Sequence, residues 1–169
     1  VALKKIKVQG VDFVWSVVGE GPQKSELLDY IKLQGLEDHV DFVGECSHES
    51  VLAMYQNHDV FVLPVQQRLD GDSDGLPNVL LEAMAYGCPV VSSRFPAVEE
   101  ALIDGENALL VKARDDDALA TAILHIMQNK EQAQVMATAD QESLKEKFDR
   151  RHCHQKLLLS LTKKWKVQS

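Results

Sequence analysis

The segment that decides the fold is Asp59-Val60-Phe61-Val62-Leu63-Pro64, a continuous apolar run of strand length. From Val60 to Pro64 every residue is apolar, rather than every second one, which is typical of a parallel strand that is buried on both faces. A long polar loop follows, and residues 77–86 then have the composition of a helix, with Pro77 in the first turn and Gly87 after the end. Pro89-Val90-Val91-Ser92 is the next apolar segment. This order predicts a β–α–β unit of a parallel sheet.

The same alternation extends from this unit in both directions. Upstream, the pattern predicts strands at 11–18 and 40–43 and helices at 25–33 and 49–57. Downstream, it predicts a helix at 98–103, a strand at 108–111, a helix at 115–127 and a helical tail over 130–169. The expected fold class is therefore α/β, a Rossmann-like open parallel sheet with helices on both faces, and residues 1–169 form a single domain. In such sheets ligands bind beyond the carboxyl ends of the strands.

Composition restricts the possible partners. The 169 residues are 45% hydrophobic and 26% charged, which fits a globular domain, and no apolar run approaches the roughly 20 residues of a membrane span. The net charge of −8 argues against a nucleic-acid partner, because phosphate backbones are bound by clustered Lys and Arg. Three widely spaced cysteines do not suggest a disulfide framework, so we expect a cytoplasmic protein.

The first residues suggest a fragment. The sequence begins at Val1 instead of Met and enters directly on the Lys-rich segment Leu3-Lys4-Lys5-Ile6-Lys7, with no turn residue before it. We therefore expect the chain to be a piece of a longer protein.

The segment richest in chemistry is the acidic loop Asp70-Gly71-Asp72-Ser73-Asp74-Gly75 and the helix that follows it. This helix is apolar nearly all round and is expected to be buried, with one polar stripe formed by Asn78, Glu82 and Tyr86. A buried carboxylate needs a partner, which the hydroxyls of a ligand would supply. The alternative is that Glu82 forms an internal salt bridge and the acidic loop is only solvated. Backbone N–H groups of Gly75, Leu76 and Asn78 at the helix start suit a phosphate.

Asp74 and Glu82 enclose seven residues, and this block resembles the E-x7-E signature of retaining GT-B glycosyltransferases, the glycogen-synthase-like superfamily (glycosyl transferases group 1). Five other segments agree with the family in order and spacing. They are Val18-Gly19-Glu20-Gly21-Pro22, Val40-Asp41-Phe42-Val43-Gly44, Asp59-Val60-Phe61-Val62-Leu63-Pro64, Gly87-Cys88-Pro89-Val90-Val91 and Asp104-Gly105-Glu106-Asn107. The resemblance implies that the chain is the C-terminal, donor-binding half of a GT-B fold.

The resemblance also implies roles for individual residues. Glu82 corresponds to the glutamate that accepts from the ribose hydroxyls, and Asp74 to the acid that contacts the transferred sugar. Gly75 and Leu76 correspond to amides that receive phosphate or sugar oxygens, with Asn78 beside them. Val43 and Gly44 lie where the base is usually contacted. Gly19 is assigned to the donor site as well, although a tight strand-to-helix turn also explains this glycine.

The sequence departs from the family at two places. The first signature acid is Asp74 instead of Glu, which shortens its reach, and Pro96-Ala97-Val98-Glu99-Glu100 replaces a pair of glycines before Pro-Glu. The Arg and Lys that neutralise the donor diphosphate have no match here. They are expected upstream of Val1, as is the N-terminal acceptor domain.

The implied activity is transfer of a sugar, with retention, from a UDP-, GDP- or ADP-sugar to a glycan or lipid-linked saccharide, without cofactor or metal. The protein would act in the cytoplasm or at the inner face of the membrane, and this fragment alone would be inactive. A non-catalytic nucleotide-binding or interaction module of the same fold is the alternative. The oligomeric state stays open.

Other motifs have competing interpretations. Asp70 to Gly75 match the opening of a calcium-binding EF-hand loop, but the twelfth position is Leu81 and a strand precedes the loop. The same acids fit a metal-binding D-x-D on spacing alone. His152-Cys153-His154 cannot converge on one ion from adjacent helical positions. The basic, Leu-rich tail fits either packing onto protein or peripheral membrane contact.

Overall fold

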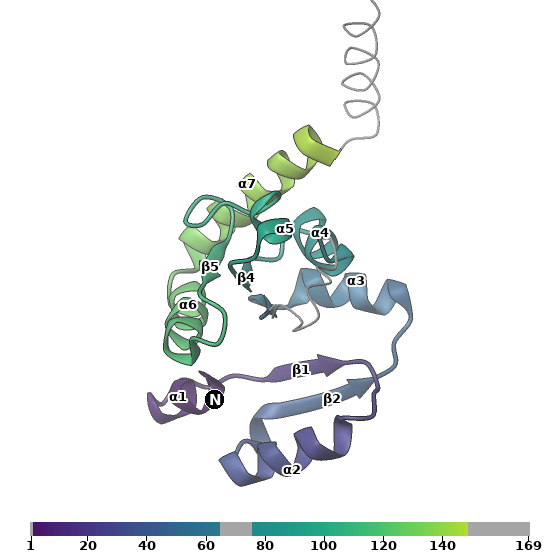
Figure 1. The fold of residues 1–169 in the computed structure, drawn as a ribbon, viewed down its shortest axis with the longest axis vertical. Coiled ribbons are helices and arrows are strands. Elements are labelled where there is room, and N and C mark those ends of the chain that lie inside the picture. Colours follow the sequence, from purple (N-terminus) through teal and green to yellow (C-terminus); the bar gives the residue numbers. More distant parts are fainter. Residues whose placement is uncertain (1, 65–75, 149–169) are drawn as a thin grey trace, which may run out of the picture.

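The computed structural model describes residues 2–64 and 76–148, with side chains through residue 139. The described strands form two parallel sheets (Figure 1). In the smaller sheet β1 (Trp15–Val18) pairs with β2 (Val40–Gly44), and in the larger one β4 (Val90–Ser93) lies between β3 (Phe61–Leu63) and β5 (Leu109–Val111). Parallel strands joined by helices confirm the α/β, Rossmann-like fold class.

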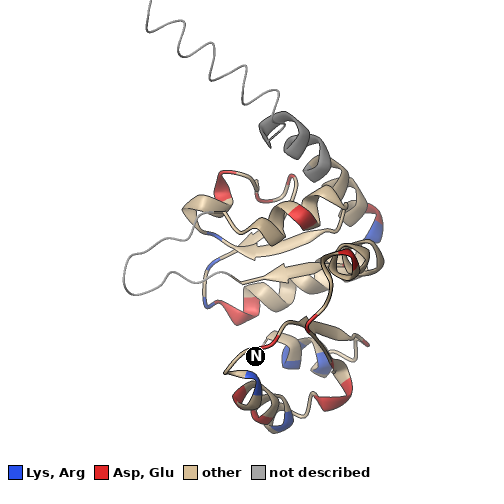
Figure 2. Ribbon diagram, turned by 90° about the vertical axis from the view of Figure 1, so that its right-hand side faces the viewer, with Lys and Arg blue, Asp and Glu red and all other residues tan. Residues whose placement is uncertain are grey.

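Helices connect the strands, and several of their ends are set by single residues. The described helices are α1 (Ala2–Val8), α2 (Lys24–Gln34), α3 (His48–Asn57), α4 (Asn78–Ala85), α5 (Pro96–Glu99), α6 (Asp116–Gln128) and α7 (Lys130–Phe148), with a 3₁₀ turn at Glu37–His39. At the start of α3 the Ser47 hydroxyl accepts from the Ser50 N–H at 3.2 Å. Gly35 ends α2 in the left-handed conformation, with φ of 64°. In Figure 2 the charged residues lie mainly on helices and loops rather than on the strands.

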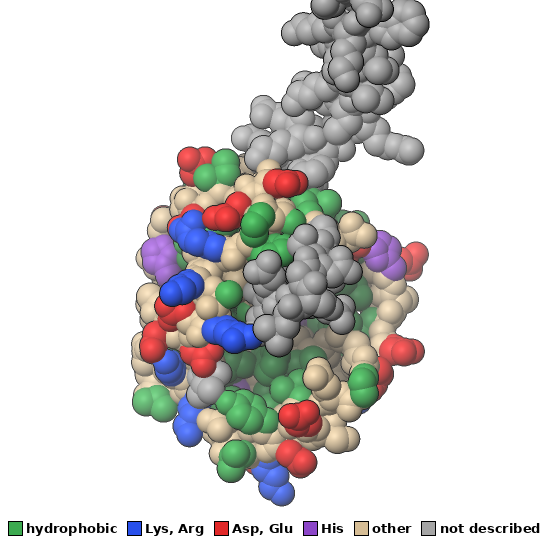
Figure 3. Space-filling model, in the orientation of Figure 1, with side chains coloured by type: hydrophobic (Ala, Val, Ile, Leu, Met, Phe, Trp, Pro, Cys, Tyr) green, Lys and Arg blue, Asp and Glu red, His purple; other side chains and the backbone are tan. Residues whose placement is uncertain are grey.

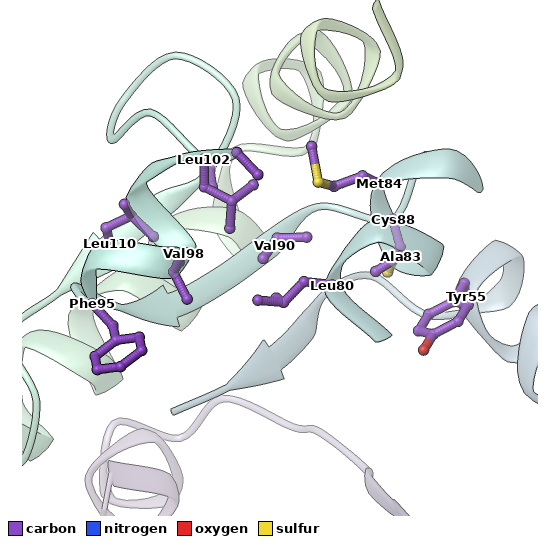
Figure 4. Packing of buried hydrophobic residues seen from close by; sticks show 12 residues of the cluster. Tyr55, Leu80, Ala83, Met84, Cys88, Val90, Phe95, Val98, Leu102 and Leu110 are labelled. Carbon is purple, nitrogen blue, oxygen red and sulfur yellow. The ribbon is translucent and has the colours of Figure 1, made fainter. Parts of the chain in front are cut away.

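The core consists of two clusters on opposite faces of the β3–β4–β5 sheet. Successive strand residues alternate between them, so that Val90 packs in one cluster and Val91 in the other. The first cluster is built from α3, α4 and the α5 region and includes Leu80, Met84, Val98 and Leu102 (Figure 4). The second cluster is built mainly from α1, α6 and α7 and includes Ala2, Ile6, Ala120, Ile123, Ile126 and Met136. Helices therefore cover both faces of this sheet.

A cavity separates the two sheets. Among the described strands, β1 pairs with β2 alone and β3 with β4 alone, so each leaves one edge unpaired. Side chains from both sheets and the adjoining helices line a cavity of about 290 Å³, including Trp15, Ile31, Leu36, Val62, Leu119 and Ile123. Figure 3 shows hydrophobic side chains gathered in a hollow on this face of the molecule. His58 links the two parts, with Nε2 2.9 Å from the Ser16 hydroxyl and Nδ1 2.8 Å from the Met54 carbonyl.

Several expectations about elements were wrong. The run 59–64 is not buried on both faces: β3 is only half-buried because it is an edge of the described sheet, whereas every residue of β4 is buried. The first strand begins at Trp15 instead of residue 11, because its pairing with β2 begins at Trp15 and Val40. Before the strand, Phe13 stacks on His39 with ring centroids 4.7 Å apart.

The helices also differ in detail from the prediction. The Lys-rich start forms α1, for which no element was predicted; its Ala2 and Ile6 pack on the second cluster. The helix expected at 98–103 begins earlier, as the short α5 with Pro96 in its first turn. No helix within the described residues is long and apolar enough to cross a membrane.

Candidate functional site

Helix α4 presents the candidate carboxylate. Pro77 precedes the helix in an extended conformation, with φ −63° and ψ 127°, so it ends the loop instead of occupying the first helical turn as predicted. Leu80, Ala83 and Met84 are buried in the first cluster. The helix is not buried all round as predicted, since Val79 is 38% exposed.

The predicted polar stripe lies on the more exposed side of this helix. Asn78 is exposed, Tyr86 is 38% exposed, and Glu82 between them is half-buried. Leu76, which was assigned to the donor site for its backbone amide, packs its side chain partly buried against the first cluster. Of the predicted site residues in this region that the structure describes, Leu76 lies just before α4, and Asn78 and Glu82 lie in it.

Glu82 has a partner inside the domain. The hydroxyl of Tyr55, in the last turn of α3, donates to Oε2 of Glu82 at 3.4 Å. Among the described residues no Lys, Arg or His forms an ion pair with Glu82, so the predicted alternative of an internal salt bridge is not met there. The Tyr55 hydroxyl is a neutral group, so this hydrogen bond does not neutralise the carboxylate charge.

Tyr55 is held firmly in place. Its side chain is 6% exposed, and its ring meets that of Phe61 edge-on at 5.3 Å between centroids. Figure 4 shows the Tyr55 ring beside Ala83 and Cys88. Burial raises the pKa of Tyr55 to about 12, and the nearby negative charge of Glu82 and the hydrogen bond to it act in the same direction. Tyr55 is therefore a neutral hydrogen-bond donor throughout the physiological range. Tyr55 lies in the helix predicted at 49–57, but it was not among the predicted site residues. The sequence feature that could have indicated this role is the hydroxyl group of Tyr55, which stands among the core-facing residues Val51, Leu52 and Tyr55.

Gly19, Val43 and Gly44 come together at the carboxyl ends of β1 and β2. The N–H of Gly19 donates to the carbonyl of Gly44 at 2.7 Å. Both glycines have positive φ, 115° and 76°, which is costly for other residues. A Cβ on Gly44 would also lie 3.2 Å from Oε1 of Glu20. Val43 beside them is 39% exposed and available for contact.

Helix α3 connects these two groups of residues. It begins soon after Gly44 and carries Tyr55 in its last turn, next to Glu82. Between Gly19, Val43 or Gly44 and Leu76, Asn78 or Glu82, the described part of the chain contains no hydrogen bond or ion pair. A ligand touching both groups would have to bridge them.

Several predicted residues lie outside the described residues. These are Asp74 and Gly75 of the donor site, the acids Asp70 and Asp72 of the metal-loop alternatives, and the tract 152–154 in the tail. In the two described segments, no group of three or more His, Cys, Asp or Glu side chains could hold a metal ion.

The segment Asp104-Gly105-Glu106-Asn107 is a structural turn. Asn107 is 3% exposed, accepts from the Ile103 N–H at 2.6 Å and donates to the Ala101 carbonyl at 3.3 Å. Asp104 accepts from the Leu110 N–H at 2.9 Å and pairs with Arg94. These contacts fix the connection between α5 and β5. The residue types of this motif are therefore accounted for by their hydrogen bonds within the turn, without a ligand.

Comparison with known proteins agrees with this architecture. The family model described as "Glycosyl transferases group 1" matches residues 1–143. The chain is 38% identical over 122 residues to the putative colanic acid biosynthesis glycosyltransferase WcaL of Salmonella typhimurium, covering 72% of this chain and 30% of that protein. It is 30% identical over 156 residues to the amylovoran biosynthesis glycosyltransferase AmsK of Erwinia amylovora, covering 92% and 38%. The chain thus spans about a third of the length of these relatives.

Solved structures share the fold. Anabaena Alr3699/HepE, in complex with UDP, superposes with a TM-score of 0.78 at 22% identity, covering 96% of this chain and 43% of that one. Sucrose-phosphate synthase from Thermosynechococcus elongatus gives a TM-score of 0.78 at 25% identity, covering 99% and 42%. The fold is that of GT-B glycosyltransferases. Together with the match over residues 1–143, this shows that the chain belongs to the group 1 family of glycosyl transferases.

Proposed function

We propose that the chain is the C-terminal, donor-binding half of a retaining glycosyltransferase, and that it binds a nucleoside-diphosphate sugar through Glu82. The observation that carries this is the half-buried Glu82 carboxylate, which has a neutral hydroxyl as its partner and no ion pair among the described residues. Such a carboxylate retains acceptor capacity for ligand hydroxyls, and the adjacent hydroxyls of a ribose are suitable donors.

The other predicted residues extend this site. In the proposal, the backbone N–H groups of Gly75, Leu76 and Asn78 donate to phosphate or sugar oxygens, and Asp74 contacts the transferred sugar. Val43 and Gly44 contact the base, and Gly19 lies beside them in the donor site. The UDP bound by HepE and the name of the related GDP-mannose-dependent mannosyltransferase of Mycolicibacterium smegmatis support a nucleoside-diphosphate donor.

The contribution to catalysis is orientation of the donor and stabilisation of the departing diphosphate, with no metal or cofactor supplied by this chain. A longer enzyme would supply the acceptor domain and transfer the sugar to a glycan or lipid-linked saccharide on the cytoplasmic side of the membrane. We expect the 169 residues alone to bind nucleotide weakly and to be inactive.

Titration of the ¹⁵N-labelled chain with UDP, GDP and ADP tests the proposal. We expect amide shifts to be largest near residues 76–82 and at Gly19 and Gly44. Glu82→Gln should weaken binding by about 1.5–3 kcal/mol, or roughly 10- to 100-fold, because charged hydrogen bonds are lost. Glu49→Gln, an exposed change on α3, is the matched control.

Two results would contradict the proposal. If no nucleotide shifts any resonance, the donor site is not present in this chain. If Glu82→Gln binds as tightly as the unchanged protein, Glu82 does not belong to the site. Binding that is intact in this chain while the longer polypeptide transfers no sugar would favour the non-catalytic module.

A further inference from the structure

The hydrogen bond from Tyr55 holds one of the two carboxylate oxygens of Glu82. Tyr55 donates to Oε2, and no described residue donates to Oε1. Glu82 is half-buried and lies on α4 between the exposed Asn78 and Tyr86. Within the described residues, one carboxylate oxygen is therefore held by a donor and the other is not.

Tyr55 is suited to holding this carboxylate still. Its ring is packed between α4 and Phe61, and the side chain is 6% exposed, so the hydroxyl has little freedom to move. The hydroxyl orients the carboxylate and leaves its charge uncompensated, which a Lys or Arg in the same place would not do. A fixed carboxylate loses less conformational entropy when a ligand binds.

We propose that Tyr55 is a positioning residue, which holds Oε2 of Glu82 so that Oε1 accepts from the hydroxyls of a ribose and selects ribose over deoxyribose. This inference rests on the proposed function. It adds a residue to the site and a chemical feature of the ligand that the site distinguishes. Tyr55 itself does not touch the ligand; it acts through Glu82.

Tyr55→Phe is the direct test, because it removes the hydroxyl and keeps the ring. Affinity is measured for the nucleoside diphosphate that binds best and for its 2′-deoxy counterpart. We expect the variant to bind the ribonucleotide about 3- to 10-fold more weakly, as for loss of one hydrogen bond, and to discriminate less against the deoxynucleotide. Tyr30→Phe is the control, because Tyr30 is exposed on α2 and is far along the chain from Tyr55 and Glu82. It should change neither the affinity for the ribonucleotide nor the discrimination against the deoxynucleotide.

A second measurement detects the contact without any ligand. Tyrosine labelled with ¹³C at Cζ reports the ionisation of Tyr30, Tyr55 and Tyr86 separately, with Tyr55 assigned by its loss in Tyr55→Phe. Glu82→Gln should lower the pKa of Tyr55 from about 12, because the negative charge beside the hydroxyl, which raises that pKa, is removed. In the Glu82→Gln background, Tyr55→Phe should weaken nucleotide binding no further.

Each contrary result overturns the proposal. An unchanged Tyr55 titration in Glu82→Gln would show that the two groups are not coupled. Unchanged affinity in Tyr55→Phe, or an equal loss with and without Glu82, would assign Tyr55 to packing alone. If the unchanged protein binds no nucleotide although the ionisation of Tyr55 responds to Glu82→Gln, the proposed function fails first, and Tyr55 then has no ligand to position for.

Discussion

At the scale of the residue, the buried hydroxyl of Tyr55 couples stability to pH. Its pKa is raised from 10.0 to about 12, first because burial disfavours the phenolate and then because Glu82 is negative. In the unfolded chain Tyr55 ionises near its ordinary value, so between pH 10 and 12 the unfolded state binds fewer protons than the folded state. The stability contributed by the neutral phenol is thus complete below pH 10 and is lost as the pH rises toward 12.

Urea unfolding at several pH values checks this expectation. Two units of pKa correspond to about 2–3 kcal/mol, so the free energy of unfolding should fall more steeply above pH 10 in the unchanged protein than in Tyr55→Phe. Tyr30→Phe should keep the steep dependence, since that side chain is 43% exposed. Parallel curves for the unchanged protein and Tyr55→Phe would refute the coupling.

The sequence could identify Glu82 as unusual, because a carboxylate stands in an otherwise apolar helix. It could not identify the partner of that carboxylate. Helical spacing in residues 49–57 places Tyr55 on the core-facing side. Whether its hydroxyl reaches Glu82 depends on how α3 packs against α4, which the sequence does not specify. Gly19 and Gly44 were more accessible to prediction, because each directly follows or ends an apolar strand and turns there require positive φ.

At the scale of the element, the connection between α5 and β5 depends on one amide side chain. Both side-chain hydrogen bonds of Asn107 are to backbone groups, and the residue is 3% exposed. We expect Asn107→Ala to lower the free energy of unfolding by about 2–3 kcal/mol, because a buried N–H and carbonyl lose their partners. Glu106→Ala, at an exposed position of the same turn, is the control, and nucleotide affinity should be unchanged in both variants. Equal stability of the two variants would show that the turn does not depend on Asn107.

The type and order of most elements could be predicted, and their burial could not. An apolar run of strand length predicted β3 correctly, but its neighbours are set by sheet order, which leaves it at an edge of the described sheet. The segment containing Lys4, Lys5 and Lys7 gave no strong helical signal by itself. It is helical because Ala2 and Ile6 can be buried against α6. This contact joins segments that are far apart in the sequence.

At the scale of the whole molecule, the two sheets differ in how much core supports them. Both hydrophobic clusters surround β3, β4 and β5, whereas in the unit from β1 to β2 the buried hydrophobic side chains are Ile31 and Leu36, each 4% exposed. Regions with little buried apolar surface open at lower free energy. We therefore expect the β1–α2–β2 unit to unfold before the rest.

Trp15 in β1 reports on this unit directly. In a Trp165→Phe variant, which removes the other tryptophan of the sequence, Trp15 fluorescence should change at a lower urea concentration than circular dichroism at 222 nm. Leu36→Ala should increase the difference between the two urea midpoints, because it destabilises the β1–α2–β2 unit. Ala137→Gly in α7 should decrease this difference, because it destabilises the part that contains β3, β4 and β5. Coincident transitions for both probes would show that the chain unfolds as one unit.

The cavity between the sheets also has a mechanical consequence. Within each sheet, neighbouring strands are joined by rows of backbone hydrogen bonds, which resist sliding along their whole length. Across the cavity, the described polar contacts are made by side chains, such as His58 to Ser16 and the Lys7 ammonium to the Gly35 carbonyl at 2.5 Å. Side-chain contacts adjust more easily than paired backbone. A force that separates the two sheets therefore meets less resistance than a force that separates strands within one sheet. We therefore expect the protein to deform more easily across the line between β1 and β3 than along its strands.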